Sequence, residues 1–370
     1  MTGTDTERLD AVGSGDSLDA GRGVVRPDTA SEVVLLAGTR DGLYRVEFDG
    51  ATACVLDTDT VHQVCRTEEA VYAATADGLY RSRDGETWQS TGLGDRTVVS
   101  VTHDPSSGRL YAGVRPAQVA VGSERAATPG DWRANVAFAR LAAASDWSTP
   151  GPFEPQVRTV AVHPGDPDRI VVGVESEGAF GTTDGGESWQ SFGVGLHDDV
   201  HHLRYADDGA RLVAATGGGL YQTRATRGGA AGSADTAWTS GAHGDEPEPT
   251  EQARWVRLDT DTDRFRFGYH REVAVHDGEL VTAALNDGLV TYEDDVAAVV
   301  ARYDGHRRQI LHEVGAAFPL SWASLAGRLF GGTRDGGLLR VDVGGVERCP
   351  VSLPSRVKSL AVAPETEVDA

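Results

Sequence analysis

Six short stretches of this 370-residue sequence share one pattern, and this repetition constrains the fold more than any other feature. Each is an apolar run ending in small residues, then a turn with glycine, then further apolar residues. The copies are LLAGTRDGLY (35–44), VYAATADGLY (71–80), VVGVESEGAF (171–180), LVAATGGGLY (212–221), VTAALNDGLV (281–290) and LFGGTRDGGL (329–338). A weaker seventh copy is RLYAGVRPAQVAV (109–121). Such repeats indicate units that bury their apolar faces against one another.

Each copy predicts a β-hairpin, whose strands we name b and c. Asp-Gly between apolar runs is a strong hairpin signal, because a tight turn needs positive φ at both central residues. An apolar strand a usually precedes the hairpin and a strand d often follows it. The strand a segments are 61–66, 98–103, 157–163, 200–205, 271–276 and 321–327, and strand d segments include TWQST, SWQSF and RWVRL. Seven repeats of four antiparallel strands predict an all-β, seven-bladed β-propeller.

The two ends of the chain complement each other. The first repeat begins directly at strand b, and the sequence finishes with RVKSLAVAP (356–364), a strand a without a hairpin of its own. Pairing this C-terminal strand with the N-terminal blade would close the ring and remove two exposed sheet edges. We therefore predict a disordered tail over residues 1–30 and a single propeller over 31–370. A flexible insertion is expected at about 224–253.

Composition limits the classes of partner. The net charge is −22, from 56 acidic and 34 basic residues, and Lys358 is the only lysine. This usage resembles haloarchaeal proteins adapted to a salt-rich cytoplasm. Such charge disfavours nucleic-acid binding. No stretch approaches the roughly 20 apolar residues of a membrane helix, and the N-terminus lacks the apolar core of a secretory signal. We predict a cytoplasmic protein without membrane contact.

Two c–d turns carry a second motif. TTDGGESW (182–189) and the shorter SRDGETW (82–88) match the Asp-box pattern. The residues that carry it are Asp84, Trp88, Asp184, Gly186 and Trp189. The chain thus resembles the BNR/Asp-box propellers, a sialidase-like group near the WD40 and YVTN propellers, and is similar to haloarchaeal β-propeller proteins. This resemblance implies that both boxes are structural and lie on the face opposite the ligand site.

The opposite face would gather the b–c turns and the starts of strand a around the central channel. Aligning the first polar position of strand a gives His62, Val99, Arg158, His201, Arg271, Ala323 and Lys358. The residues before the b–c turns are Arg40, Ala76, Arg115, Glu175, Gly217, Asn286 and Arg334. Many of these are cationic in a strongly acidic chain. Arginine can bind carboxylate or phosphate through two hydrogen bonds, so this rim predicts a site for an anion.

The predicted ligand-binding residues are Arg40, His62, Arg115, Trp147, Arg158, Glu175, His201, Arg271, Arg334 and Lys358. Trp147 joins this set from a d–a loop. The alternative is that the cations pair with nearby acids such as Asp41, Asp199 and Asp335. We expect an anionic small molecule or a protein partner as the ligand, and no cofactor.

Two further interpretations concern chemistry. His197, Asp199 and His201 are close enough in sequence to bind Zn²⁺ or Mn²⁺, but His201 and His202 point to opposite sides of a strand, which favours structural or channel-lining roles. The third and fourth repeats are similar to proteins called BNR-repeat glycosyl hydrolases, with Glu175 as the weak catalytic candidate. The Phe/Tyr-Arg-Ile-Pro motif of sialidases is absent. We therefore favour a non-catalytic binding or scaffold protein, with a glycoside hydrolase as the alternative.

Overall fold

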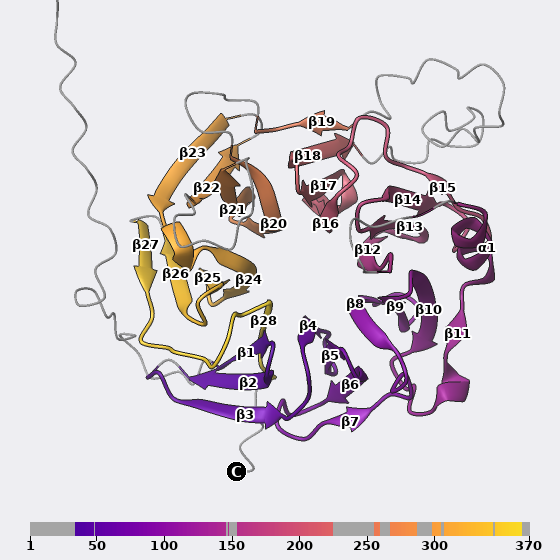
Figure 1. The fold of residues 1–370 in the computed structure, drawn as a ribbon, viewed down its shortest axis with the longest axis horizontal. Helices are drawn as coiled ribbons and strands as arrows, with labels where there is room; N and C mark the ends of the chain where they lie inside the picture. The colour runs from indigo at the N-terminus through magenta and orange to yellow at the C-terminus, as the bar shows by residue number, and fades with distance from the viewer. Residues whose placement is uncertain are drawn as a thin grey trace, which may run out of the picture.

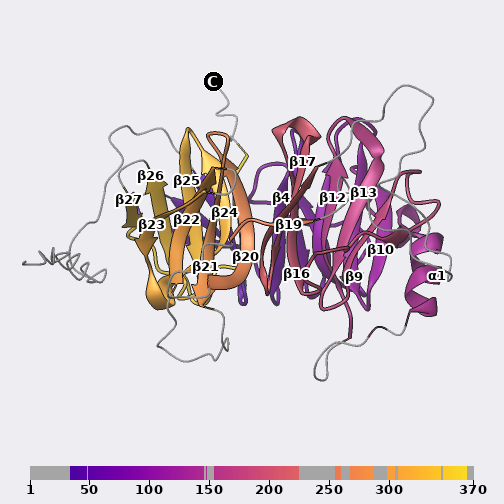
Figure 2. The same ribbon diagram turned by 90° about the horizontal axis from the view of Figure 1, so that it is seen from above.

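Seven four-stranded antiparallel sheets form a ring around a central channel, which confirms the predicted seven-bladed β-propeller (Figure 1). The strands run roughly along the channel axis (Figure 2). The computed structural model describes residues 34–47, 49–145, 147, 154–224, 255–259, 267–286, 298–304, 307–342 and 345–364. The predicted tail (1–30) and nearly all of the predicted insertion (224–253) lie outside these residues. No described helix is long and apolar enough to cross a membrane.

The blades are numbered from the N-terminus, each strand set being given from the inside outward. Blade 1 holds β28 (Ser359–Val362), β1 (Val34–Thr39), β2 (Gly42–Glu47) and β3 (Thr52–Leu56). Blade 2 holds β4 (Val61–Arg66), β5 (Val71–Thr75), β6 (Gly78–Ser82) and β7 (Gln89–Ser90). Blade 3 holds β8 (Thr97–Asp104), β9 (Arg109–Arg115), β10 (Gln118–Ser123) and β11 (Arg133–Ala134). Blade 4 holds β12 (Val157–His163), β13 (Asp166–Val174), β14 (Gly178–Thr182) and β15 (Gln190–Ser191).

Blade 5 holds β16 (Val200–Ala206), β17 (Arg211–Thr216), β18 (Gly219–Arg224) and β19 (Val256–Arg257). Blade 6 holds β20 (Phe267–His276), β21 (Glu279–Asn286), β22 (Ala298–Asp304) and β23 (Arg307–Glu313). Blade 7 holds β24 (Pro319–Leu325), β25 (Arg328–Thr333), β26 (Leu338–Asp342) and β27 (Gly345–Arg348). The connecting helices are α1 (Val136–Ala144) and the short 3-10 turns η1 (Pro129–Asp131), η2 (Asp207–Gly209) and η4 (Gly315–Ala317).

The C-terminal strand closes the ring as predicted. β28 pairs antiparallel with β1, with Leu36 opposite Ala361. This strand also contacts the next blade, since the Val64 amide donates to Ser359 Oγ at 2.9 Å and the Arg66 guanidinium donates to the carbonyl oxygen of Ala363, directly after β28, at 2.6 Å. The last described strand therefore joins blade 1 to blade 2 as well as completing blade 1.

Apolar clusters fill the seams between neighbouring blades. Strand b is buried on both faces, because successive side chains point into different seams: Leu35 packs toward blade 7 and Leu36 toward blade 2. The small residues that end each strand b lie where the blades converge. A Cβ at Gly38 would lie 2.7 Å from Val61 Cγ1, closer than real Cβ atoms approach. This crowding explains the small residues in the repeat.

The b–c turns correct one expectation about backbone conformation. Asp41 does not adopt positive φ, whereas Gly42, the first residue of β2, has φ of 110°. The Thr39 hydroxyl closes the turn instead, accepting from the Asp41 amide at 3.0 Å and donating to the Gly42 carbonyl oxygen at 2.9 Å. Blade 2 repeats this with Thr75. Neither central residue, Arg40 or Asp41, has positive φ, so the threonine side chain rather than a left-handed pair fixes the turn.

Both Asp-box turns join strand c to strand d, as predicted. Asp184 Oδ1 accepts from the Ser188 amide at 3.0 Å and from Thr182 Oγ1 at 2.6 Å, and Gly186 has φ of 95°. Burial acts to raise the pKa of Asp184, but these hydrogen bonds outweigh it and lower the pKa to about 2. In blade 2, Asp84 accepts in the same way from the Glu86 and Thr87 amides. Both aspartates hold their turns, and Trp88 and Trp189 pack against the seam clusters.

One element was not predicted from the sequence. Helix α1 packs on the outer side of the ring, where Phe138 contacts the Trp189 ring at a centroid distance of 5.2 Å (Figure 1). Asn135 caps the helix, its Oδ1 accepting from the Phe138 amide at 2.8 Å and from Trp189 Nε1 at 3.1 Å. Its Nδ2 donates to the Gly186 carbonyl oxygen at 3.0 Å. A single asparagine therefore fixes the helix start to the Asp-box turn of blade 4.

Candidate functional site

A pocket lies where the inner strands of the blades meet, with about 460 Å³ of empty space that is partly open to solvent. Its lining residues come from all seven blades, and most are polar. They are His62, Gln63, Val99, Arg158, Thr159, His201, His202, Arg271, Glu272, Leu320, Lys358 and Ser359. We call this the channel pocket. It contains five of the ten predicted ligand-binding residues: His62, Arg158, His201, Arg271 and Lys358.

A repeated β-bulge creates this convergence. At the start of the inner strand in six blades, the register with strand b skips one residue. In blade 6 the skipped residue is Gly268, which is not among the lining residues. The skipped residues of the other five blades all line the channel pocket: His62, Val99, Arg158, His201 and Leu320. A bulge turns a side chain away from the regular alternation. In blade 7 the bulged residue is Leu320, so the predicted position Ala323 is wrong; Ala323 pairs with Phe330 and packs in a seam.

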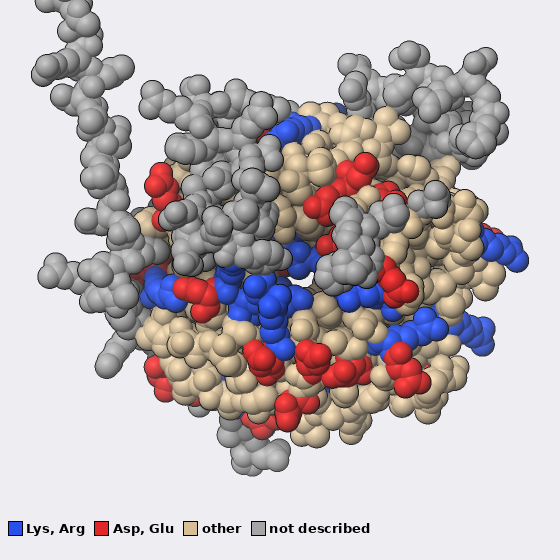
Figure 3. Space-filling view, in the orientation of Figure 1, with Lys and Arg blue, Asp and Glu red and all other residues tan. Residues whose placement is uncertain are grey.

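The cationic residues of the channel pocket influence one another. Lys358 Nζ lies 3.1 Å from His62 Nδ1. Burial, followed by the charges of Arg158, Arg40, Arg356 and Arg115, lowers the pKa of Lys358 to about 7. Burial and the charge of Lys358 lower the pKa of His62 to about 2, so this imidazole is neutral. In the surface view, lysine and arginine atoms gather around the central opening (Figure 3).

Arg115, Arg158 and Glu175 meet around Gln156 at the edge of the pocket. Arg115 Nε donates to Gln156 Oε1 at 3.0 Å, and Gln156 Nε2 donates to the Glu175 carboxylate. Arg158 lies 3.5 Å from the same carboxylate, so this pair is a long contact rather than a bidentate one. The predicted alternative, neutralisation by acids, therefore applies in part to Arg158, through its contact with Glu175 and through its electrostatic interaction with Asp199.

Glu272 is the carboxylate that lines the channel pocket. Its Oε1 accepts from the Trp322 amide at 3.2 Å, which ties blade 6 to blade 7. Burial raises the pKa of Glu272 to about 7, despite hydrogen bonds from Ser321 and Trp322 that act to lower it. Near neutral pH this side chain is therefore only partly ionised, and it balances only part of the surrounding positive charge.

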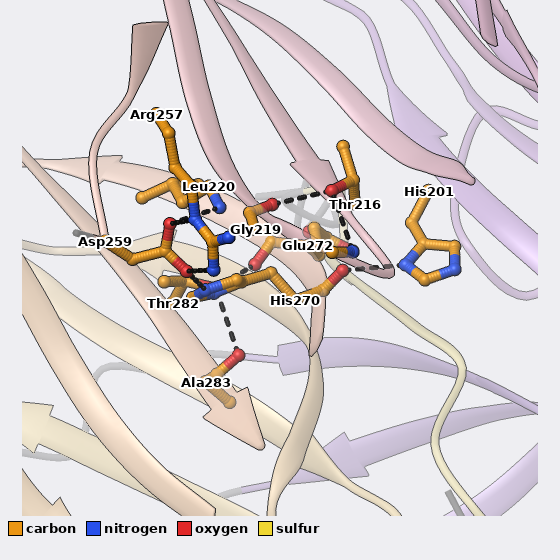
Figure 4. Close-up of polar contacts among 11 residues, drawn as sticks. His201, Thr216, Gly219, Leu220, Arg257, Asp259, His270, Glu272, Thr282 and Ala283 are labelled. Atoms are coloured by element: carbon orange, nitrogen blue, oxygen red, sulfur yellow. Dashed lines mark hydrogen bonds and ion pairs between the residues drawn. The ribbon is translucent and has the colours of Figure 1, made fainter. Parts of the chain in front are cut away.

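His201 is held by a chain of polar contacts at the seam of blades 5 and 6 (Figure 4). Its Nδ1 lies 2.7 Å from the carbonyl oxygen of His270, and its Nε2 lies 3.2 Å from the Asp199 carboxylate. The His270 ring is fixed in turn by Asp259, and Arg257 Nε contacts the same carboxylate at 2.7 Å. Burial acts to raise the pKa of Asp199, but the hydrogen bond and charge of His201 outweigh it and lower this pKa.

The three metal candidates lie close together, but their polar atoms are already engaged in contacts with protein atoms. These candidates are His197, Asp199 and His201. The Nδ1 atom of His197 accepts from the Asp199 amide at 3.2 Å, and both ring nitrogens of His201 face oxygen atoms. Within the described residues, no group of three histidine, cysteine, aspartate or glutamate side chains is arranged to hold a metal ion. A Cβ added at Gly217 would lie 2.2 Å from Asp199 Oδ2, so the Asp199 side chain occupies the space that a side chain at position 217 would need.

Other predicted residues lie outside the pocket lining. The ring of Trp147 packs against Phe180 at 5.1 Å and Phe138 at 5.8 Å in the cluster beneath α1, and it is not among the residues that line the channel pocket. Arg334 lies over the Phe318 ring, and the acid beside it, Asp335, pairs with Arg348 at 2.8 Å. Arg40 and Arg115 influence the channel pocket electrostatically, because their positive charges help to lower the pKa of Lys358.

Sequence reasoning missed several lining residues, among them Leu320 and Glu272. Glu272 follows Arg271 directly, and a regular strand would point the two side chains to opposite faces. A second irregularity between His270 and Val273 brings both to the pocket. Nothing in the local sequence marks that bulge.

Comparisons with known proteins identify the fold and no closer relationship. No protein-family model matches the chain, and no curated protein does. Among solved structures, a Bacteroides uniformis protein provisionally assigned as a 6-phosphogluconolactonase is 13% identical, with a TM-score of 0.58 over 90% of this chain and 99% of that one. The WD40 β-propeller domain of Doa1 is 12% identical, with a TM-score of 0.56 over 90% of each chain. A chain of the mitotic checkpoint complex is 14% identical, with a TM-score of 0.55 over 98% of this chain and 93% of that one.

Proposed function

We propose that the protein is a non-catalytic binding protein that takes an anionic ligand in the channel pocket. The observation that carries this proposal is the clustering of Arg158, Arg271 and Lys358 in one pocket of a chain whose net charge is −22. Like charges held together in a partly buried site repel one another. An anion would relieve this repulsion on binding, and it would gain charge-assisted hydrogen bonds.

The carboxylates near the pocket balance only part of this positive charge, since Asp199 is also paired with His201 at 3.2 Å. Glu272 is partly protonated near neutral pH, and Glu175 is shared between Gln156 and a 3.5 Å contact with Arg158. The pocket is small enough for a compact anion, so we favour a small carboxylate or phosphate over an acidic protein segment. A protein partner that binds independently of Arg158 would instead support a scaffold role.

Thermal-shift and calorimetric titrations with inorganic phosphate and citrate test this proposal. We expect both anions to raise the melting temperature of the wild type. Arg158→Ala and Arg271→Ala, which each remove a cation from the pocket lining, should weaken binding about tenfold or more, as expected when one charge-assisted contact is lost. Arg302→Ala is the matched control, because Arg302 pairs with Glu279 at 3.1 Å and does not line the pocket. Equal shifts in all four proteins would contradict a channel site.

A glycoside hydrolase remains the second candidate because of one observation. Glu272 lines the pocket with a pKa of about 7, a range suited to a general acid. The two Asp-box turns support kinship with the BNR propellers, which include such enzymes. Glu175 would then supply the second carboxylate. Hydrolysis of aryl glycosides or sialosides that disappears in both Glu175→Gln and Glu272→Gln would favour the enzyme over the binding protein.

A further inference from the structure

Lys358 is the only lysine among 34 basic residues, and it lies in the channel pocket. Arginine serves at every other basic position. The two residues differ chemically, because the guanidinium of arginine keeps its proton in proteins, whereas the amine of a buried lysine can lose one. A site that needed only positive charge could use arginine here as elsewhere. The placement points to chemistry that an arginine cannot perform.

The surroundings of Lys358 favour a neutral amine. Burial and four arginines, Arg158, Arg40, Arg356 and Arg115, lower its pKa to about 7. About half of the molecules would then carry a free amine at that pH. Desolvation and neighbouring cations are the means by which proteins activate lysine as a nucleophile.

His62 completes the arrangement. Its Nδ1 lies 3.1 Å from Lys358 Nζ, and its low pKa keeps the ring neutral, so Nδ1 can accept a hydrogen bond from the amine. Such a contact holds the Nζ atom in one direction without adding charge. Lys358 itself is fixed by its backbone, since its amide donates to the Gly38 carbonyl oxygen at 2.7 Å beside β28. His62 therefore acts as a positioning residue for the amine.

We propose that Lys358 forms a reversible imine with a 2-oxo acid, whose carboxylate is held by Arg158 and the neighbouring arginines of the channel pocket. This inference rests on the proposed anion-binding function and names the class of its ligand. An anionic carbonyl compound satisfies both features of the pocket, because its carboxylate meets the arginines while its carbonyl carbon meets the amine.

The chemistry balances without a further reactant. The Nζ lone pair attacks the carbonyl carbon, and the proton lost from nitrogen moves to the former carbonyl oxygen, giving a carbinolamine. Loss of that hydroxyl with the second nitrogen proton releases one water and leaves the carbon–nitrogen double bond. Addition of water reverses the sequence and restores the free lysine.

Reductive trapping tests the proposal. The full-length protein is incubated at pH 7 with pyruvate and sodium cyanoborohydride, and peptide mass mapping locates any carboxyethyl group. We expect Lys358 to be modified at least about tenfold faster than the α-amino group of the same chain, because binding in the pocket raises the effective concentration. Lys358→Arg keeps the positive charge and should show no adduct at this position. His62→Phe should slow trapping while leaving the folded protein intact.

Two further probes separate this inference from the function on which it rests. Lactate has the same carboxylate without a carbonyl group, and its binding is measured by calorimetry to the wild type and to Lys358→Arg. Lactate binding without a pyruvate adduct would overturn the imine and leave anion binding in place. Absence of both would overturn both proposals. Acetone, which lacks the carboxylate, should react far more slowly than pyruvate, and an equal rate would contradict an anionic carbonyl ligand.

Discussion

Asp259 Oδ2 lies 3.2 Å from His270 Nε2, and neither side chain is exposed to solvent. Asp259 follows the outer strand β19 of blade 5, whereas His270 belongs to the inner strand β20 of blade 6. The contact therefore crosses the seam, and the backbone carbonyl of His270 contacts His201 of the channel pocket. A buried polar pair thus connects the outside of one blade to the lining of the channel.

Removing Asp259 should destabilise the fold strongly. Asp259→Ala removes the buried carboxylate that holds the His270 ring, and breaking a buried pair costs about 3–5 kcal/mol. Urea unfolding measures this loss. His276→Ala is the matched control, because His276 contacts the exposed Asp277 at 3.7 Å, and such surface pairs contribute under about 1 kcal/mol. Similar losses in both variants would contradict a structural role for the buried pair.

Lys358 should make stability depend on pH. Its pKa of about 7 in the folded protein lies below the ordinary 10.5, so the unfolded chain binds more protons between these values. The free energy of unfolding therefore gains a contribution that rises as pH increases through this window. Lys358→Met removes the contribution, so its stability relative to the wild type should be greatest below pH 7 and decline toward pH 10. Parallel denaturation curves for the two proteins across pH 7 to 10 would contradict the lowered pKa.

Closure of the ring should be essential for cooperative unfolding. Deleting residues 356–370 removes β28 and exposes β1 and the inner end of the seam with blade 2. We expect the truncated protein to lose the single thermal transition of the full chain, observed by calorimetry or circular dichroism. Deleting residues 365–370 alone leaves β28 in place and serves as the control. An unchanged transition in the longer truncation would refute the closure.

Asn135 should contribute more than an ordinary helix cap. Asn135→Ala removes the cap of α1 together with two contacts to blade 4, to Trp189 and Gly186, and we expect a loss of about 2 kcal/mol. Asn135→Asp keeps the acceptor oxygen for the Phe138 amide and Trp189 but loses the donor to Gly186. The urea midpoint of the aspartate variant should therefore lie between those of the alanine variant and the wild type. Equal midpoints for the two variants would show that the cap contact is unimportant.

Much of the candidate site followed from aligning the repeats. His62, Arg158 and His201 occupy equivalent positions at the start of the inner strands, and all three line the channel pocket. The alignment failed at Ala323, because the bulge in blade 7 falls at Leu320 instead. Trp147 was predicted from a d–a loop rather than from the alignment, and its ring packs in the aromatic cluster beneath a helix that no repeat predicts. A bulge and a packed helix depend on neighbouring strands, which local periodicity does not describe.

The sequence by itself determined the blade pattern, the closing strand and the two Asp-box turns. These features arise from local signals: alternating apolar residues, glycine turns, and an aspartate that binds amides a few positions away. Only the tertiary structure decided which side chains share the channel. Lys358 and His62 meet although they are 296 residues apart, because the closing strand lies beside the inner strand of blade 2. Their altered pKa values arise from burial and charges contributed by separate blades, which no single repeat contains.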